Sequence, residues 1–286
     1  KLNLLLLLVV LCGFSTVPAC VFLCINGTML FTLRSKPVFR DTCRYILLYN
    51  LLLADTAHLV VSQLLFLLAV CRVRLTYPAC GTISTIANLT GGISPLTLVV
   101  MSLERYVAVC FPLRHASIIT TRNTAVAIIA SWAISSINNL TRDYCYDITW
   151  FPSTQRDNYD KAYTCLVFVS AGLAVIYSYT GVVVAARSAS TDKASAHKAR
   201  KTLLLHLIQL GLSLSSMIYH TLLIALARTV SRLVFVWVQD VFYVFFVILP
   251  RCLSSLLYGL RDQTIRPVLL HYLCCHLRFP VEPGLG

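Results

Sequence analysis

A single long stretch without charge constrains this chain more than any other feature of its sequence. Residues 81–103 contain no charged side chain; Cys80 precedes them and Glu104-Arg105-Tyr106 follows. If the stretch is helical, Cys80 and Arg105 lie about 37 Å apart, because a helix rises about 1.5 Å per residue. The hydrocarbon core of a bilayer is only about 30 Å thick. The stretch therefore predicts a membrane-spanning helix with a thiol near one membrane surface and a charged triplet at the other.

The composition excludes an ordinary soluble domain and gives no sign of an enzyme. Hydrophobic residues make up 58% of the chain and charged residues only 12%, which is typical of membrane proteins. The net charge of +13 does not form the basic stripe with interleaved aromatics that is typical of nucleic-acid binding. The 12 cysteines include no Cys-x-x-Cys pair, so neither a metal nor another cofactor is predicted. We expect contact with membrane lipid, no nucleic-acid partner and no catalytic residues.

Further apolar runs on both sides of this stretch predict additional spans, and together they give an all-α membrane protein with a bundle of seven transmembrane helices. The Lys and Arg residues gather mainly in the connectors on the side of the Glu-Arg-Tyr triplet, and such residues accumulate in cytoplasmic loops. The N-terminus is therefore expected outside the cell. The runs are residues 2–33, 45–70, 125–137, 163–186, 202–227 and 234–258.

The fourth apolar run is unusually short. Residues 125–137 would reach only about 20 Å as a helix, whereas a spanning helix needs about 20 residues. A deletion in the gene model, a decayed gene or a tolerated short helix would each give such a short run. We expect poor delivery of the chain to the cell surface, improved by inserting roughly seven apolar residues after Ile137.

Three strings carry a resemblance to a known family. Residues 101–115 read Met-Ser-Leu-Glu-Arg-Tyr-Val-Ala-Val-Cys-Phe-Pro-Leu-Arg-His, residues 192–212 enter the sixth run, and Tyr258-Gly-Leu-Arg261 ends the seventh. These strings resemble the odorant receptors of fish, within the rhodopsin-like G-protein-coupled receptors. Two departures stand out: Ala171 replaces the usual proline of helix five, and Ser254-Ser255 replaces Asn-Pro in helix seven.

The resemblance implies a plasma-membrane receptor that binds a small-molecule odorant outside and activates a heterotrimeric G protein inside, through cyclic AMP. One alternative is a rhodopsin-like receptor for another small ligand, and a second is a non-functional truncated receptor. A transporter is disfavoured because the sequence shows no internal repeat and no paired broken helices. By resemblance the receptor domain covers residues 1–273, and residues 274–286 form a cytoplasmic tail.

The same resemblance assigns residues to the ligand pocket and to activation. Glu104 is expected to hold Arg105 in the resting receptor, and Arg105 to meet the G protein in the active one. The start of the sixth helix offers no acid to Arg105. The expected activation residues are Glu104, Arg105, Tyr106, Tyr179 and Tyr258. The expected ligand contacts are Ser84, Ala87, Asn88, Gly91, Met217, His220, Thr221, Tyr243 and Val244.

A polar site inside the membrane is expected around Asp55. Counted along their helices from the triplet side, Asp55 and Arg251 lie roughly 15 Å and 10 Å deep, so their side chains are expected to meet. In the family this acid and a serine matching Ser94 can take sodium. We hypothesise that Arg251 replaces the ion; the alternative is that Arg251 faces a water-filled cavity and Asp55 is protonated. The full expected site is Asn26, Asp55, Ser94, Arg251 and Ser254.

Several covalent features and a tail helix complete the expectations. By resemblance Cys80 pairs with Cys145 in a disulfide, with Cys165 as an alternative partner. Asn139 begins an Asn-Leu-Thr sequon and is a candidate for glycosylation. Cys274 and Cys275 are either palmitoylated or free thiols. Apolar residues at helical spacing predict a short amphipathic helix after helix seven, namely Ile265, Val268, Leu269, Tyr272 and Leu273.

Overall fold

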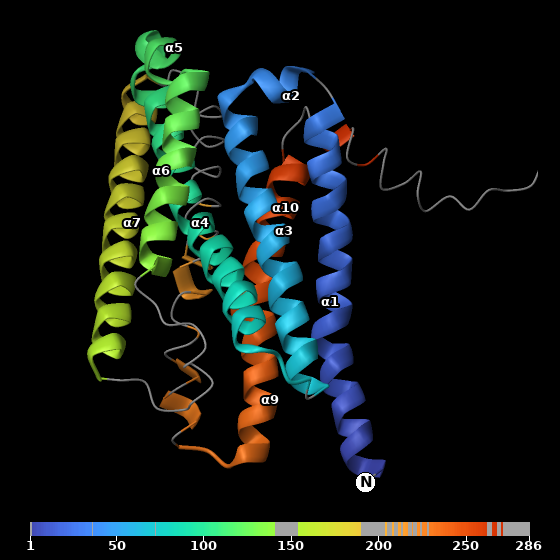
Figure 1. Cartoon of the computed structure of the whole chain (residues 1–286). Coiled ribbons are helices and arrows are strands. Elements are labelled where there is room, and N and C mark those ends of the chain that lie inside the picture. The colour runs from blue at the N-terminus through green and yellow to red at the C-terminus, as the bar shows by residue number, and fades with distance from the viewer. Residues whose placement is uncertain are drawn as a thin grey trace, which may run out of the picture.

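The structure is a computed structural model, and all of its described regular structure is helical (Figure 1). It describes residues 2–35, 37–71, 73–140, 154–189 and 229–261, together with shorter pieces between residues 204 and 270. These pieces are residues 204, 208, 211–212, 214–216, 219, 222–223, 225–227, 265–267 and 270.

The helices follow the apolar runs of the sequence, with short turns between some of them. The last three segments form one continuous rod, in which a π-helical stretch, η3, separates two α-helices. In chain order the elements are α1 (Leu2–Ser35), α2 (Pro37–Asp41), α3 (Cys43–Val70), α4 (Tyr77–Cys110), η1 (Pro112–Arg114), α5 (His115–Ile118), α6 (Thr121–Leu140), α7 (Thr154–Ala189), α9 (Arg232–Phe242), η3 (Tyr243–Ile248) and α10 (Leu249–Arg261).

Among the described residues, 5 helical segments are long and apolar enough to cross a membrane. The predicted sixth span falls largely outside the described residues. We call the end of the bundle that carries Glu104-Arg105-Tyr106 the triplet end, and the opposite end the Cys80 end. The 5 segments are Cys12–Ser35, Cys43–Val70, Tyr77–Cys110, Ala162–Gly181 and Val234–Leu257.

The structure corrects the expected length of the fourth helix. Helix α6 contains 20 residues, about 30 Å along its axis, although its apolar run is shorter. Polar residues extend it at both ends: Thr124 is buried near its start, and Asn139 is buried near its end, where its Nδ2 donates to the Ser135 carbonyl at 3.0 Å. A short fourth helix is therefore not confirmed, and an insertion after Ile137 is not needed for length.

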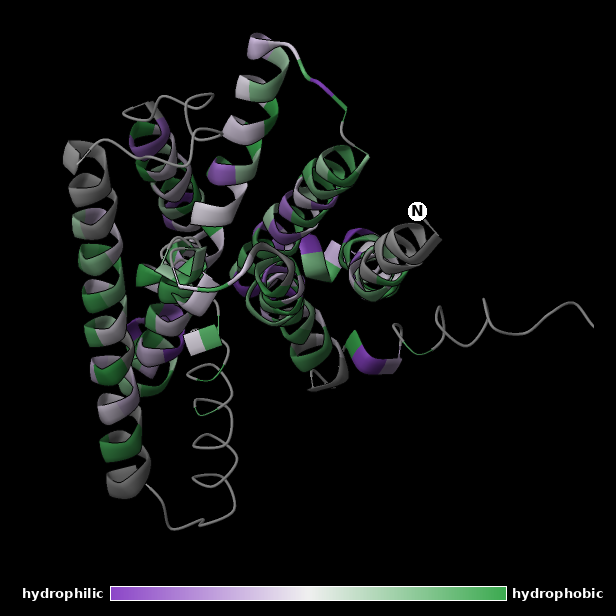
Figure 2. Ribbon diagram, turned by 90° about the horizontal axis from the view of Figure 1, so that it is seen from below, coloured by the Kyte–Doolittle hydropathy of each residue, from purple (hydrophilic) through white to green (hydrophobic). Residues whose placement is uncertain are grey.

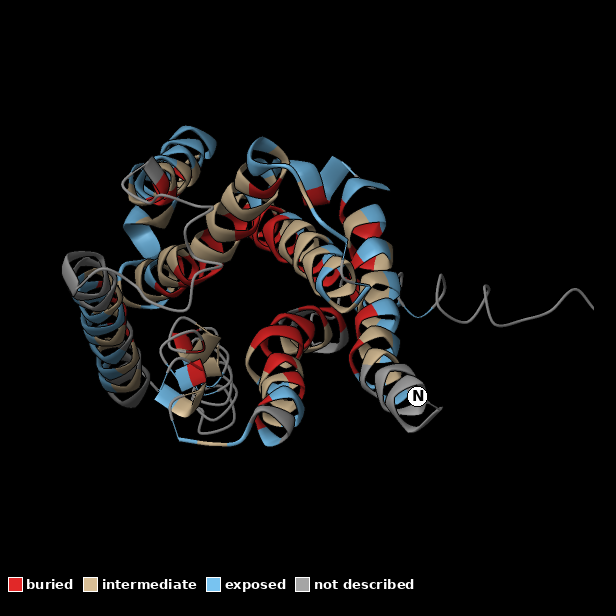
Figure 3. Ribbon diagram, turned by 60° about the horizontal axis from the view of Figure 1, so that its bottom comes forward, coloured by how far each residue is buried: buried red, intermediate tan, exposed pale blue. Residues whose placement is uncertain are grey.

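Helix α4 lies at the centre of the bundle, against α3, α6 and α7, while α3 also packs against α1. The stretches of ribbon coloured as buried lie mostly toward the inside of this arrangement, and those coloured as exposed lie mostly toward its periphery (Figure 3). The periphery of α6 and α7 includes exposed apolar residues such as Ile129 and Leu166, at 67% and 68% exposure. In the hydropathy colouring, hydrophobic residues run along several of the helices (Figure 2). This distribution suits helices whose outer faces contact lipid.

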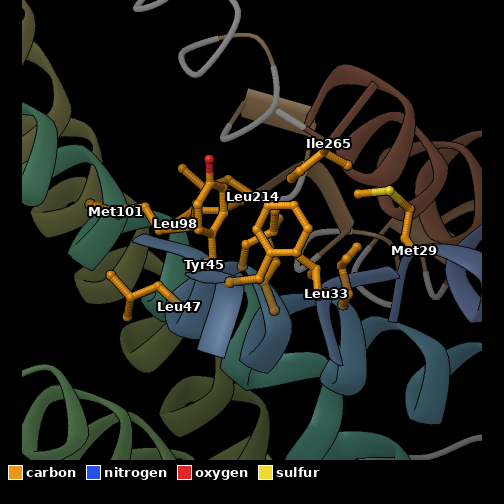
Figure 4. Packing of buried hydrophobic residues seen from close by; sticks show 13 residues of the cluster. Met29, Leu33, Tyr45, Leu47, Leu98, Met101, Leu214 and Ile265 are labelled. Atoms are coloured by element: carbon orange, nitrogen blue, oxygen red, sulfur yellow. The ribbon is translucent and has the colours of Figure 1, made fainter. Parts of the chain in front are cut away.

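Two clusters of buried apolar residues hold the bundle together. The one toward the triplet end joins residues far apart in the sequence, among them Met29, Tyr45, Met101, Leu214 and Ile265 (Figure 4). Ile265 is fully buried in this cluster, so the chain just after α10 packs back onto the bundle. The remaining residues of the predicted tail helix, and Cys274 and Cys275, lie outside the described residues. The cluster toward the Cys80 end includes Ala19, Leu59, Tyr219, Phe235, Tyr243 and Val247.

The contact between α4 and α6 depends on a glycine. A Cβ atom on Gly92 would lie only 2.6 Å from the Ser135 Oγ of α6. That hydroxyl in turn donates to the Leu89 carbonyl of α4 at 2.8 Å. Small residues let helix backbones approach closely in membranes, and here the approach makes the hydroxyl bond possible.

Replacing this glycine with valine is expected to push the two helices apart. We predict that Gly92→Val lowers the thermal stability of the detergent-solubilised protein, by about 1–3 kcal/mol as in other overpacked interiors. Gly27→Val is the matched control, because a Cβ atom on Gly27 of α1 meets nothing within 4 Å. Thermal unfolding followed with a thiol-reactive dye measures both variants. Equal losses in the two variants would contradict the close contact.

Candidate functional site

The middle of the bundle contains a buried pair of opposite charges. Asp55 of α3 is 1% exposed and Arg251 of α10 is 5% exposed. The Arg251 Nε lies 3.6 Å from the Asp55 Oδ1, an ion-pair contact that is too long for a hydrogen bond. The Ser94 hydroxyl of α4 donates to the same Oδ1 at 2.5 Å, and the Arg251 Nη1 donates to the Val247 carbonyl at 2.8 Å. Three helices therefore meet at one carboxylate.

A histidine that sequence reasoning left without a role lies beside this pair. The His58 Nδ1 is 2.8 Å from the Ala87 carbonyl, and because a carbonyl only accepts, this nitrogen donates. A Cβ atom on Gly91 would lie 2.9 Å from the His58 Cε1 and 3.9 Å from the Arg251 Nη2. Ala87 and Gly91 were predicted as ligand contacts, and the structure places them against His58. The spacing of His58 three residues after Asp55, on one helix face, could have revealed the cluster.

The other members of the expected polar site lie nearby but pair differently. Asn26 of α1 accepts a hydrogen bond from the Ser255 hydroxyl of α10, whereas the side chain of Ser254 lies outside the described part of the structure. A further link joins three helices: the Asn50 Nδ2 donates to the Thr97 Oγ1 at 3.1 Å, and the Trp132 Nε1 donates to the Asn50 Oδ1 at 3.0 Å. Sequence reasoning missed these partners.

At the triplet end, Glu104 lies between two basic side chains. Its Oε2 is 3.6 Å from the Arg105 Nε, and its Oε1 is 3.8 Å from the His115 Nε2 of α5. Glu104 is itself buried, at 8% exposure. The role of Glu104 in holding Arg105 in the resting receptor stays a prediction. His115 was not among the expected residues, although the turn at Pro112 brings α5 back toward α4.

Helix α7 packs against the triplet end of α4 through polar and aromatic contacts. The Ser178 hydroxyl donates to the Ser102 carbonyl at 2.7 Å, and the rings of Tyr106 and Tyr177 lie 5.4 Å apart. Tyr179 follows on α7 and is half-buried. The side chain of Tyr258 lies outside the described part of the structure. Of the expected activation residues, Glu104, Arg105 and Tyr106 thus lie on α4 and Tyr179 on α7.

The predicted ligand contacts that the structure describes lie on α4 and η3. Ser84 and Asn88 are half-buried on α4, and Val244 is half-buried on η3. The Tyr243 hydroxyl donates to the Gln63 Oε1 of α3 at 3.3 Å, and its ring stacks on Phe66 with centroids 5.7 Å apart. The Gln63 Nε2 donates to the Thr16 Oγ1 of α1 at 2.8 Å. Met217, His220 and Thr221 lie outside the described residues.

Of the residues expected to carry covalent features, the structure describes Cys80, Asn139 and Cys165. Among the described residues, Cys80 is a buried free thiol and Cys165 an exposed one, and Cys145 lies outside the described part. Asn139 is 4% exposed with its amide bonded inside α6. A glycosylated asparagine needs an exposed amide, so this placement does not suit the predicted glycosylation.

The disulfide between Cys80 and Cys145 stays a prediction with a direct test. Since disulfides persist on the oxidising side of a membrane, Cys80→Ser and Cys145→Ser are each expected to lower surface expression to the same extent. The double variant should be no worse than either single one, because both remove the same bond. Cys165→Ser is the control and should have little effect. Surface labelling checks this; a large loss in Cys165→Ser and none in Cys145→Ser would identify Cys165 as the partner instead.

Comparison with known proteins identifies the family of this bundle. Residues 25–258 match the model of the seven-transmembrane receptor family, rhodopsin family. The chain belongs to this family. One relative is odorant receptor 131-2 of Danio rerio, which is 34% identical to this chain over 273 residues. The alignment covers 89% of this chain and 83% of the relative. This chain is 24% identical over 258 residues to human olfactory receptor 4K15, covering 80% and 75%. The resemblance seen in the sequence is thereby confirmed for this rhodopsin-family receptor, a multi-pass membrane protein.

Proposed function

We propose that this receptor detects a small-molecule odorant on the outside of the plasma membrane and activates a heterotrimeric G protein on the inside. The identity of 34% across 89% of the chain with an odorant receptor carries the proposal. The Lys and Arg bias of the connectors supports the orientation, with the triplet end in the cytoplasm and the N-terminus outside. The family resemblance supports the cyclic AMP pathway as the route of the signal.

The polar groups of the bundle support two different tasks for its two ends, ligand binding at the Cys80 end and coupling at the triplet end. Toward the Cys80 end a mostly apolar cluster lies next to a few polar groups, including Tyr243 and Gln63, and groups of these kinds suit contact with a small organic ligand. The triplet end offers Arg105, whose Nε lies 3.6 Å from the Glu104 Oε2. The Asp55–Arg251 pair lies between the two ends and joins α3 to α10. A ligand that shifts the helices at one end can therefore change their packing at the other.

A ligand panel tests this function. The epitope-tagged receptor is expressed with the stimulatory olfactory G protein, surface expression is verified by labelling, and cyclic AMP is followed with a reporter. We expect at least one odorant to raise cyclic AMP in a concentration-dependent way, with no response in cells that lack the receptor. A sensor of G-protein dissociation covering the other Gα classes is read in parallel. A receptor that reaches the surface and activates no G protein with any panel member would contradict the proposal.

A further inference from the structure

The rod formed by α9, η3 and α10 carries a second buried charge that the central pair does not involve. Asp240 of α9 is 2% exposed and lies about 13 Å from Ser231, at the start of the helix, toward the membrane centre. No hydrogen bond of normal geometry reaches either carboxylate oxygen from the described residues. None of the ion pairs found within the described part of the chain involves Asp240. Its carboxyl is therefore buried without a compensating charge in that part.

Two tyrosines and a serine lie near the Asp240 carboxyl. The Ser15 hydroxyl of α1 interacts with its carboxyl and supplies no compensating charge. Tyr219 and Tyr243 lie close enough to interact with it electrostatically, and both belong to the same buried cluster as Phe235. The Tyr243 hydroxyl does not neutralise the carboxylate, because its proton is donated to the Gln63 Oε1 at 3.3 Å.

A carboxylate in such a place favours one chemical class of partner. An ionised acid inside a membrane protein is costly unless it is paired. Aromatic rings next to the acid attract a cation through their π faces and do not attract an anion. A carboxylate with aromatic neighbours thus suits a protonated amine, and it repels a carboxylic acid, which is ionised at neutral pH.

The position of Asp240 connects this chemistry to the odorant. Tyr243 is one of the predicted ligand contacts, and Tyr219 directly precedes another, His220. We propose that Asp240 anchors the ammonium group of an amine odorant, with Tyr219 and Tyr243 beside it. The inference rests on the proposed odorant-receptor function and adds the class of the ligand.

Matched sets of ligands test the proposal on the unaltered receptor. Each set contains a primary amine, the alcohol and the carboxylic acid with the same hydrocarbon part, such as hexylamine, hexan-1-ol and hexanoic acid. Linear, branched, cyclic and aromatic sets are included. We expect amines to be half-maximally active at concentrations at least about tenfold lower than their alcohols, as for other desolvated charge pairs, and the acids to be inactive. A receptor that responds to odorants of other classes but to no amine would overturn this proposal and leave the odorant-receptor function standing.

Substitutions of Asp240 test whether its carboxylate causes the preference for amines over alcohols. Asp240→Asn keeps the shape and removes the charge, and it is expected to abolish the preference for amines over alcohols. Asp240→Glu keeps the charge and should retain the preference. Asp41→Asn, an exposed acid of α2 at the opposite end, is the control and should behave as the unaltered receptor. Asp240→Asn that reaches the surface and still prefers amines tenfold would show that the carboxylate is not the anchor. If this variant does not reach the surface, the comparison of matched amines and alcohols on the unaltered receptor decides.

Discussion

Asp55→Ala and Arg251→Ala are each expected to abolish delivery of the receptor to the cell surface. Each substitution leaves the opposite charge buried without its partner, since both side chains are almost inaccessible and their charged atoms lie 3.6 Å apart. Removing one member of such a pair costs about 3–5 kcal/mol, a large part of a typical folding free energy of about 5–15 kcal/mol. Surface labelling of an epitope tag in intact cells measures the loss.

Neutralising both members of the pair is expected to recover part of the expression. Asp55→Asn with Arg251→Gln removes both charges and keeps side chains of similar size, and the Ser94 hydroxyl retains an acceptor on residue 55. Replacing a whole buried pair is often nearly neutral, so the double variant should exceed both alanine variants and both corresponding single neutral variants. The control is the exposed neighbouring pair of α2, Arg40→Gln with Asp41→Asn, which should have small additive effects. Additive losses at positions 55 and 251 would show that the two charges do not stabilise each other.

The same pair is expected to make the receptor insensitive to sodium. Because Arg251 occupies the place beside Asp55, we expect no sodium to be required or bound there. Agonist potency should be unchanged when sodium chloride is replaced by N-methylglucamine chloride at constant ionic strength. A clear sodium effect on potency would instead favour a hydrated cavity in which Arg251 leaves the carboxylate accessible.

Arg105→Ala is expected to abolish agonist-driven signalling while the protein still reaches the surface. Arg105 stands at the end of the long uncharged part of α4 and is only partly buried, with 22% of its side chain exposed, so its loss should not unfold the bundle. The expected defect is therefore in coupling to the G protein. Arg114→Ala is the matched control, because Arg114 is an exposed arginine at the same end. Cyclic AMP is measured at equal surface expression, and a normal response of Arg105→Ala would reject the assigned role.

The sequence predicts the 5 helical segments that are long and apolar enough to cross a membrane, because length and apolar content can be read directly along the chain. The heights of Asp55 and Arg251 also follow from residue counting, since a helix has a constant rise. The fourth helix was misjudged for a related reason: an apolar run gives the part of a helix that suits lipid, not the whole helix. Beyond the run, Asn139 is still helical, and its amide donates to the Ser135 carbonyl one turn earlier in α6.

Contacts between helices could not be predicted, because they depend on how each helix is rotated and tilted, and packing against neighbours sets both. Two residues at equal depth can face each other or opposite sides. For this reason Ser255, which was not among the expected residues, contacts Asn26, and His58 and His115 lie in sites from which they were left out. Asp240 was missed because a single acid near the end of an apolar run looks like an interface residue until its burial is known.

The π-helical stretch η3 also affects how this receptor can be compared with its relatives. A π turn holds about one residue more than an α turn, and one residue corresponds to a rotation of about 100° around a helix axis. Arg251 and Tyr258 lie on one side of η3 and Asp240 lies on the other. Against a relative whose seventh helix is α-helical throughout, the two halves match only if a gap of one residue is placed within residues 243–248. Without that gap, the alignment is shifted by one residue on the Cys80 side of η3. Each ligand contact of such a relative is then assigned to the position next to the correct one, and Asp240 is aligned with a residue on a different face of the helix.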